Sequence, residues 1–173
     1  MADDPSAASA PGAGVRTPDA VARTATVDDL AAVEPLVEAA SAEKAAQRGG
    51  ELWHRRERRG GPVAEALAKA VAADDYELAV GTYDGAVVGY ALVRADHLAD
   101  GGVLGVIDDL YVDPGARSVG LGEALMDHLL DWSRAQGCFG VDSIALPGDR
   151  STKNFFESFG LVARAILVHR RLD

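Results

Sequence analysis

The chain has 173 residues with a formal net charge of −10, and 48% of its residues are hydrophobic. This length and composition are typical of one globular domain with a substantial buried core. The acidic balance argues against nucleic-acid binding, which depends on surplus Lys and Arg, and no run approaches the roughly 20 apolar residues that span a membrane.

The N-terminal part predicts a tail, a strand and a helix. Residues 1–20 are rich in Ala, Pro, Ser and Gly and have no periodicity, so we expect a disordered tail ahead of a single domain at 21–173. Residues 21–26 suit a short first strand. A helix capped by Asp28 or Asp29 is expected next, with a kink or a late start at Pro35.

The middle of the chain predicts a second helix and three strands. The basic segment 48–62 lies between Gly-Gly pairs and is expected to form a loop with one helical turn, followed by a helix at 63–73. Two strand patterns then flank Asp84-Gly85, a strong signal for a hairpin. A Gly-rich loop at 100–102 precedes a further strand at 103–112.

The C-terminal part alternates helices and strands. Apolar residues recur at helical spacing from 121 to 136, and Gly137 ends that pattern. The pattern then predicts a strand at 140–146, a helix at 149–159 capped by Asp149, and a last strand at 162–172. Antiparallel strands followed by a strand–helix–strand–helix–strand unit indicate a mixed α/β sheet.

The strand at 103–112 contains an irregularity. Its large residues Ile107, Leu110 and Val112 break the period of two, so a regular strand would place Ile107 and Leu110 on opposite faces. One extra residue, a β-bulge, returns both to the core side. Such a bulge opens a gap beside the next strand, where a ligand with amide groups can pair with the strand edge.

A glycine-rich turn joins this strand to the next helix. Gly120 and Gly122 leave the backbone bare at the helix start, where unpaired N–H groups and the positive end of the helix dipole attract anions. Arg117 adds a positive charge. The turn therefore suits a pyrophosphate, although a glycine-rich turn with a solvated arginine explains the same residues.

The segment "LYVDPGARSVGLGEALMDHLLDWSRAQG" resembles the acyl-CoA signature of the GNAT superfamily of N-acetyltransferases, whose loop is [QR]-x-x-G-x-[GA]. "DRSTKNFFESFGL" is similar to the second motif of that family, the helix that closes over CoA. The resemblance implies a single GNAT-like domain, with a mostly antiparallel central sheet flanked by helices and a bulged strand before the pyrophosphate loop.

The resemblance also implies where acetyl-CoA binds. The backbone of Leu110, Tyr111 and Val112 is expected to pair with the pantetheine amides. The pyrophosphate loop comprises Arg117, Ser118, Val119, Gly120, Leu121 and Gly122. Asp149 and Phe156, on the closing helix, complete the predicted CoA site. The acetyl thioester would lie between the strands at 104–112 and 140–146, and a substrate amine would attack it directly.

Three positions depart from the family pattern. The tyrosine that protonates the leaving thiolate is matched by Phe156, which cannot donate a proton. Asp149 replaces an asparagine that often begins the closing motif. The glutamate that many members with protein N-terminal substrates carry on the fifth strand is matched by Ile144. Acid–base chemistry must therefore come from other residues or from water.

Asp108 is the predicted catalytic base. Members that acetylate small polyamines or aminoglycosides often carry an acid two residues before the "L-Y-V" equivalent, and that position is Asp108. The alternative is that Asp108 and Asp109 only cap the bulge by accepting from freed backbone N–H groups. Trp53, His54 and His97 are weaker candidates for the amine site.

The sequence thus favours an acetyl-CoA-dependent N-acetyltransferase, with a small-molecule or protein amine as acceptor. The alternative is an acyl-CoA-binding module that has lost turnover. No metal is expected, because His and Cys residues do not cluster at ligand spacing. A single cysteine, Cys138, suits a reducing, cytoplasmic setting. A C-terminal strand at the sheet edge would favour a homodimer.

Overall fold

The computed structural model describes residues 20–56 and 62–172. The predicted tail at 1–20 therefore lies outside the described residues except for Ala20, which begins the first strand. Within the described ranges no helix is long and apolar enough to cross a membrane.

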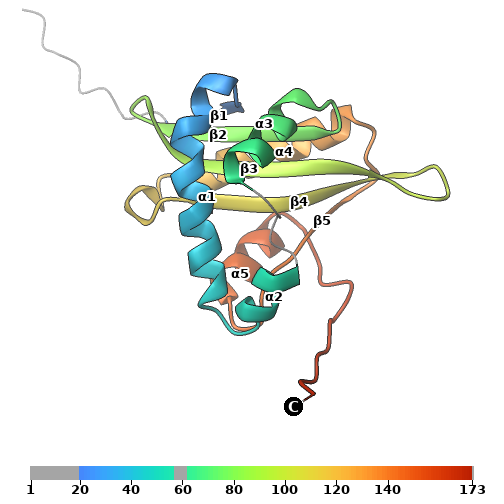
Figure 1. The fold of residues 1–173 in the computed structure, drawn as a ribbon. Helices are drawn as coiled ribbons and strands as arrows, with labels where there is room; N and C mark the ends of the chain where they lie inside the picture. The colour runs from blue at the N-terminus through green and yellow to red at the C-terminus, as the bar shows by residue number, and fades with distance from the viewer. Residues whose placement is uncertain (1–19, 57–61, 173) are drawn as a thin grey trace, which may run out of the picture.

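One five-stranded sheet forms the centre of the molecule, in the order β1-β2-β3-β4-β5 (Figure 1). The first three pairings are antiparallel, and β4 and β5 are parallel. The strands are β1 (Ala20–Thr24), β2 (Tyr76–Tyr83), β3 (Ala86–His97), β4 (Val103–Val112) and β5 (Val141–Ser143). The helices are η1 (Val27–Asp29), α1 (Leu30–Ala45), α2 (Gly50–Arg56), α3 (Val63–Ala72), η2 (Pro114–Ala116), α4 (Leu121–Ala135) and α5 (Arg150–Ser158).

Helices cover both faces of the sheet, and each face has its own core. On one face α1 and α3 pack Val33, Val37 and Leu67 against apolar residues of β2 and β3. On the other face α4 buries Leu121, Leu125, Met126 and Leu129, none more than 1% exposed, against the same strands and β4. This three-layer arrangement confirms the mixed, mostly antiparallel α/β fold expected from the sequence.

The bulge in β4 is present at the expected place. Leu92 pairs with Asp109 while Val93 pairs with Ile107, so Asp108 is the extra residue that has no partner in the β3–β4 register. As a result Ile107 and Leu110 both pack into the core beside α4, whereas Asp109 and Tyr111 turn to the face covered by α1. The break in the alternating pattern of the sequence therefore predicted the position of the bulge correctly.

Local turn chemistry also followed the sequence. The hairpin turn has positive φ at both Asp84 (49°) and Gly85 (81°), as a two-residue primed turn requires. Asp149 caps α5 by accepting from the backbone N–H of Thr152 at 3.0 Å. Gly160, with φ of 83°, follows the end of α5.

Several expectations were wrong. Residues 162–172 form no strand; they run as an extended segment away from the sheet (Figure 1). Apolar and β-branched residues show that a segment can form a strand, but they do not show whether the edge of a sheet is close enough to pair with it. β5 is three residues long rather than seven. α1 passes through Pro35 without a late start, and the segment after Gly49 forms the seven-residue helix α2.

Candidate active site

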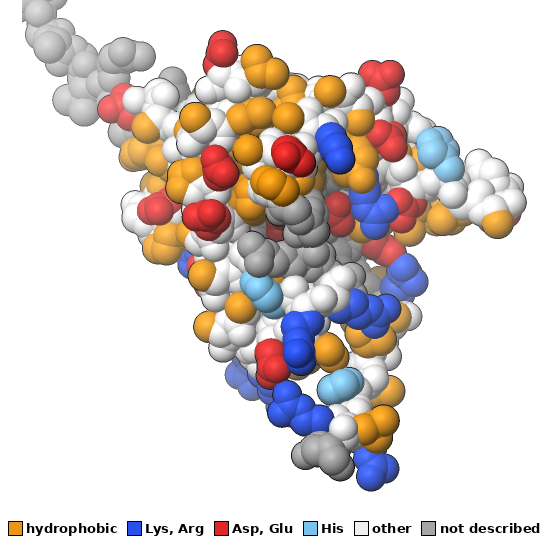
Figure 2. All heavy atoms as spheres, in the orientation of Figure 1, with side chains coloured by type: hydrophobic (Ala, Val, Ile, Leu, Met, Phe, Trp, Pro, Cys, Tyr) orange, Lys and Arg blue, Asp and Glu red, His pale blue; other side chains and the backbone are white. Residues whose placement is uncertain are grey.

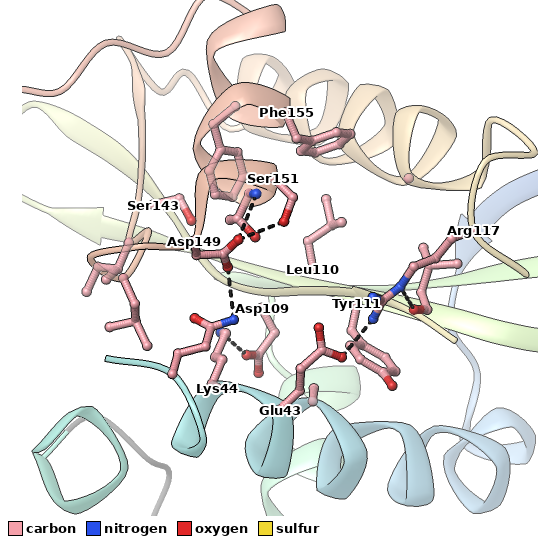
Figure 3. Close-up of a pocket in the computed structure, with 18 of the residues that line it drawn as sticks. Glu43, Lys44, Asp109, Leu110, Tyr111, Arg117, Ser143, Asp149, Ser151 and Phe155 are labelled. Carbon is pink, nitrogen blue, oxygen red and sulfur yellow. Dashed lines mark hydrogen bonds and ion pairs between the residues drawn. The ribbon is translucent and has the colours of Figure 1, made fainter. Parts of the chain in front are cut away.

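Two cavities lie on either side of β4 and meet at its bulge. The first has a volume of about 410 Å³ and is bounded by α1, β4, the loop before α4, the end of β5, and α5 (Figure 3). The second, of about 330 Å³, lies among α1, α2, α3, β3 and β4. Four residues line both cavities: Lys44, Asp108, Asp109 and Ile144.

The first cavity exists because β4 and β5 separate. Their pairing covers three residues and ends where Ile107 faces Ser143. The Ser143 hydroxyl donates to the carbonyl oxygen of Ile107 at 3.1 Å, which closes the end of the ladder. Beyond this point, within the described residues, the β5-facing edge of 108–112 borders the cavity instead of a strand. The family resemblance implies that the acetyl thioester lies in this gap.

The loop before α4 borders the first cavity through Arg117, Ser118, Gly122 and Glu123, whereas the predicted residues Val119, Gly120 and Leu121 are not among the described lining residues. Gly120 has φ of 85°, a left-handed conformation that side chains with a Cβ rarely adopt, and a Cβ built there would meet no atom within 4 Å. Ser118 is also left-handed, with φ of 67°. α4 begins at Leu121, so the N–H groups of its first turn lie beside this open space and are available to an anion.

The Arg117 side chain does not project freely into the cavity, because two acceptors hold its guanidinium. Nη2 donates to Glu43 Oε2 at 2.8 Å, and Nε donates to the carbonyl oxygen of Val112 at 2.9 Å. The guanidinium also lies over the Tyr111 ring, 5.5 Å from the centroid. Its hydrogen bond to Glu43 raises the pKa of Arg117. The arginine therefore bridges the loop to α1 at the cavity mouth (Figure 3).

The opposite wall is made by α5. Asp149 accepts hydrogen bonds from the Ser151 hydroxyl at 2.8 Å and from Gln47 Nε2 at 3.1 Å, in addition to its capping bond. Burial tends to raise the pKa of Asp149, but these hydrogen bonds outweigh it and lower the pKa. Phe155 and Phe156 line the same wall, and Phe156 is 9% exposed because it also packs into the core.

The two acids of the bulge have different surroundings. The Asp108 side chain is 29% exposed, faces both cavities, and lies 3.3 Å from Arg94 Nε. Asp109 is buried and accepts from Lys44 Nζ at 3.0 Å. Lys44 in turn lies over the Trp53 ring, 4.7 Å from its centroid. Asp108 is therefore the more accessible of the two acids, and its role as the base and that of Asp109 as a structural residue stay predictions.

Other sequence candidates are dispersed. Trp53 lines the second cavity, but His54 and His97 are not among the described residues that line either cavity. The described residues contain no group of three His, Cys, Asp or Glu side chains that could hold a metal ion. Sequence reasoning missed Glu43, Lys44, Gln47 and Arg94, because their contacts with the site span long stretches of chain.

The chain belongs to the GNAT acetyltransferase family, whose sequence profile, described as "Acetyltransferase (GNAT) family", matches residues 40–161. This confirms the family that the glycine loop and closing helix indicated. The chain is also 34% identical over 91 residues to a glucosamine 6-phosphate N-acetyltransferase of Trypanosoma brucei brucei, a match that spans 51% of this chain and 58% of that relative.

Solved structures share the fold. An aminoglycoside N-acetyltransferase in complex with CoA superposes with a TM-score of 0.73 at 15% identity, covering 91% of this chain and 97% of that one. A glucosamine-6-phosphate N-acetyltransferase from Arabidopsis thaliana superposes with a TM-score of 0.61 at 21% identity, covering 90% of this chain and 99% of that one.

Proposed function

We propose that this protein transfers the acetyl group of acetyl-CoA to a primary amine of a small cationic molecule, by direct attack of the amine on the thioester. The observation that carries this proposal is that two cavities meet at one accessible carboxylate, Asp108. The first cavity adjoins the open edge of β4 and the start of α4, which suit the cofactor, and the second meets it at the bulge, where an acceptor can reach Asp108.

In this proposal acetyl-CoA occupies the first cavity. The pyrophosphate binds the N–H groups at the start of α4, next to Ser118 and Gly120. The pantetheine lies along residues 110–112 of β4, on the edge that β5 leaves open. Its sulfur then lies near the end of the β4–β5 ladder, between the bulge and α5. The family relationship supports acetyl-CoA as the co-substrate.

The reaction needs no covalent enzyme intermediate. Asp108 accepts a proton from the bound ammonium, directly or through one water, and leaves a neutral amine. The amine nitrogen forms a bond to the thioester carbonyl carbon, and the carbon–sulfur bond breaks as the amide forms. The thiolate leaves without an acid because thiols ionise near pKa 8.5. The attacking nitrogen loses one further proton as the amide forms, and water carries this proton to the departed thiolate.

The second cavity favours a cationic acceptor. Its described lining includes three acids and two bases: Glu38, Asp108, Asp109, Lys44 and Arg94. Lys44 lies against Asp109 and Arg94 against Asp108, so these charges balance and Glu38 gives the described lining an excess of one negative charge. Amino sugars are the acceptor class that the named relatives suggest, and among these the described charges favour an unphosphorylated, polycationic amine over an amino-sugar phosphate.

A catalytically inactive acyl-CoA-binding module is the second candidate. It is favoured by the apolar residues Phe156 and Ile144, which stand where family members often carry an acid or base. We further propose that the chain acts in the cytoplasm, as one domain beginning near residue 20, without a metal and without nucleic-acid or membrane partners.

A thiol-release assay separates the two candidates. The protein is incubated with acetyl-CoA and a panel of amines comprising polyamines, aminoglycosides, glucosamine and glucosamine 6-phosphate, and free CoA thiol is measured against a no-amine blank. We expect amine-dependent turnover, largest for an unphosphorylated polyamine or aminoglycoside. Saturable binding of acetyl-CoA without thiol release from any amine would favour the binding module instead.

A further inference from the structure

Among the four described residues that line both cavities, Lys44 alone carries a positive charge. The other cations of the described lining belong to one cavity each, Arg94 to the second and Arg117 to the first. Arg94 lies against Asp108, and Arg117 is held by Glu43 at the cavity mouth. In the proposed reaction the acetyl group in the first cavity and the amine in the second therefore meet beside Lys44.

Three contacts hold the Lys44 ammonium in place. Its Nζ donates to Asp109 Oδ1 at 3.0 Å and to the backbone carbonyl oxygen of Asp108 at 3.5 Å. It also lies over the Trp53 ring, 4.7 Å from the centroid. Figure 3 shows the Lys44 side chain reaching from α1 toward β4, where it meets Asp109. A charge that is already held in position does not have to reorganise during a reaction, which is the condition for effective electrostatic catalysis.

The ion pair presents its positive member to the cavities. The Lys44 side chain is 25% exposed, whereas the Asp109 side chain is 9% exposed. The carboxylate therefore holds Lys44 from within the wall and leaves part of the ammonium open to a bound molecule.

We propose that Lys44 is a catalytic residue whose ammonium stabilises the negative charge that forms on the acetyl carbonyl oxygen. This inference rests on the acetyl transfer proposed above. As the amine nitrogen bonds to the carbonyl carbon, one electron pair of the C=O double bond moves onto the oxygen. The pair returns as the carbon–sulfur bond breaks and sulfur leaves with the bonding electrons. Lys44 keeps its proton throughout, so Asp108 remains the base.

The overall charge of the molecule opposes the formation of this further negative charge. The chain has a net charge of −10. Figure 2 shows Lys and Arg side chains gathered toward the end of the molecule that carries residues 162–172, with most Asp and Glu side chains on the opposite part. The long-range field therefore gives no help to the oxyanion, and a cation in direct contact has to supply the stabilisation.

The test uses the thioester carbonyl itself as a probe and needs no amine. Acetyl-CoA labelled at the carbonyl carbon is bound to the protein, and isotope-edited infrared spectroscopy measures its C=O stretching frequency. An ammonium beside the oxygen polarises this bond, so the frequency should be lower in the native protein than in Lys44→Met. Lys69→Met is the control, because Lys69 is exposed on α3 and is not among the described lining residues.

A double variant answers the case in which Lys44→Met fails to fold because Asp109 is left without its partner. Lys44→Met combined with Asp109→Asn removes both charges, so it should fold and give the higher frequency. Asp109→Asn alone keeps the ammonium and should give the lower one. Where an amine turns over, Lys44→Met should lower kcat roughly 10- to 100-fold at unchanged CoA affinity, somewhat less than the loss of a fully enclosed oxyanion donor. Lys44→Arg should recover part of this loss.

Each result decides the matter. A C=O frequency that is the same in the native protein and in the folded neutral variants overturns the inference and leaves the oxyanion to backbone N–H groups. Lower CoA affinity with unchanged kcat also overturns it, because Lys44 would then only bind the cofactor. A lowered native frequency in a protein that releases no thiol with any amine would instead keep Lys44 beside the carbonyl and refute the proposed acetyl transfer.

Discussion

The two cavities beside the bulge differ in how much of their lining one continuous segment supplies. The loop side of the first cavity comes from one continuous segment, from Leu110 through the glycine turn to the start of α4. The second cavity takes side chains from α1, α2, α3, β2, β3 and β4 and from Ile144 after β5, so its lining spans residues 37 to 144. A site built from backbone can be recognised in a short motif, whereas a site built from distant side chains requires the fold.

The cavities also differ in what supplies their charge. In the first, Arg117 is engaged by Glu43, so the attraction for an anion comes mainly from the N–H groups at the start of α4. In the second, every described charge belongs to a side chain and most are paired with one another. Substitutions should therefore affect cofactor binding on one side of β4 and turnover on the other.

The largest expected effect is on cofactor binding, from Gly120→Val. The branched side chain would occupy the open space where the pyrophosphate is proposed to bind, and φ of 85° is unfavourable for it. We expect CoA affinity to fall by roughly 100-fold or more, because two hydrogen bonds to a charged group contribute about 1.5–3 kcal/mol each. Calorimetric titration of the folded variant provides the measurement.

Gly101→Val is the matched control for Gly120→Val. Gly101 has φ of 86°, also has no atom within 4 Å of a built Cβ, and lies in the β3–β4 loop. It should lose similar stability while keeping native CoA affinity. Equal losses of affinity in both variants would show that backbone strain, rather than the loop, explains the effect.

The next effect is on turnover, from Asp108→Asn. The amide keeps the shape of the side chain but cannot accept a proton, so kcat/KM should fall roughly 10- to 1,000-fold, while CoA affinity and melting temperature change little. Asp96→Asn is the control, because Asp96 also pairs with Arg94 but is not among the described lining residues. A folded Asp108→Asn variant with native turnover would leave Asp108 only a structural role at the bulge.

These two residues show why parts of the site could be predicted. Gly120 was predicted because glycines at a helix start leave the backbone bare for an anion and match the family loop. Asp108 was predicted because the family resemblance places an acid there, at the bulge that the broken period of two indicates. Both are local constraints. Asp149 was likewise recognisable as a helix cap, although its bond to Gln47 across 102 positions was not.

The remaining features depend on contacts that no local pattern encodes. Lys44 and Glu43 lie near the end of a helix whose predicted apolar stripe places them outside the core, yet they contact Asp109 and Arg117 some 65 and 74 residues away. Residues 162–172 have the composition of a strand but form none among the described residues. Strand pairing requires an available edge, and the availability of an edge is a property of the whole fold.

A smaller effect should come from Glu43→Gln. Glu43 neutralises Arg117 at the mouth of the first cavity, so removing its charge leaves the guanidinium free to attract the pyrophosphate. We expect CoA affinity to rise roughly two- to five-fold, as the exposed pair is worth about 1 kcal/mol or less. The gain should shrink at high salt. Weaker binding in this variant would mean that Glu43 positions Arg117 rather than competing for it.

The smallest effect is expected at Phe156, where a tyrosine would restore the acid that the family pattern carries. Phe156 packs into the core beside α4 and forms part of the wall of the first cavity, near the proposed position of the sulfur. A thiolate with a pKa of about 8.5 leaves readily at neutral pH, so Phe156→Tyr should raise kcat by no more than about two-fold and leave CoA affinity unchanged. Phe156→Ala removes part of the cavity wall and should lower both kcat and CoA affinity.

Steady-state kinetics across pH, with Phe159→Tyr as the control, tests this assignment. Phe159 packs against the same core but is not among the described residues that line the cavity, so its hydroxyl should leave the pH profile unchanged. If Phe156→Tyr loses as much activity as Phe156→Ala, the ring edge is packed where no hydroxyl fits. Phe156 would then face the core instead of the sulfur, and the alignment of α5 with the closing helix of the family would be wrong.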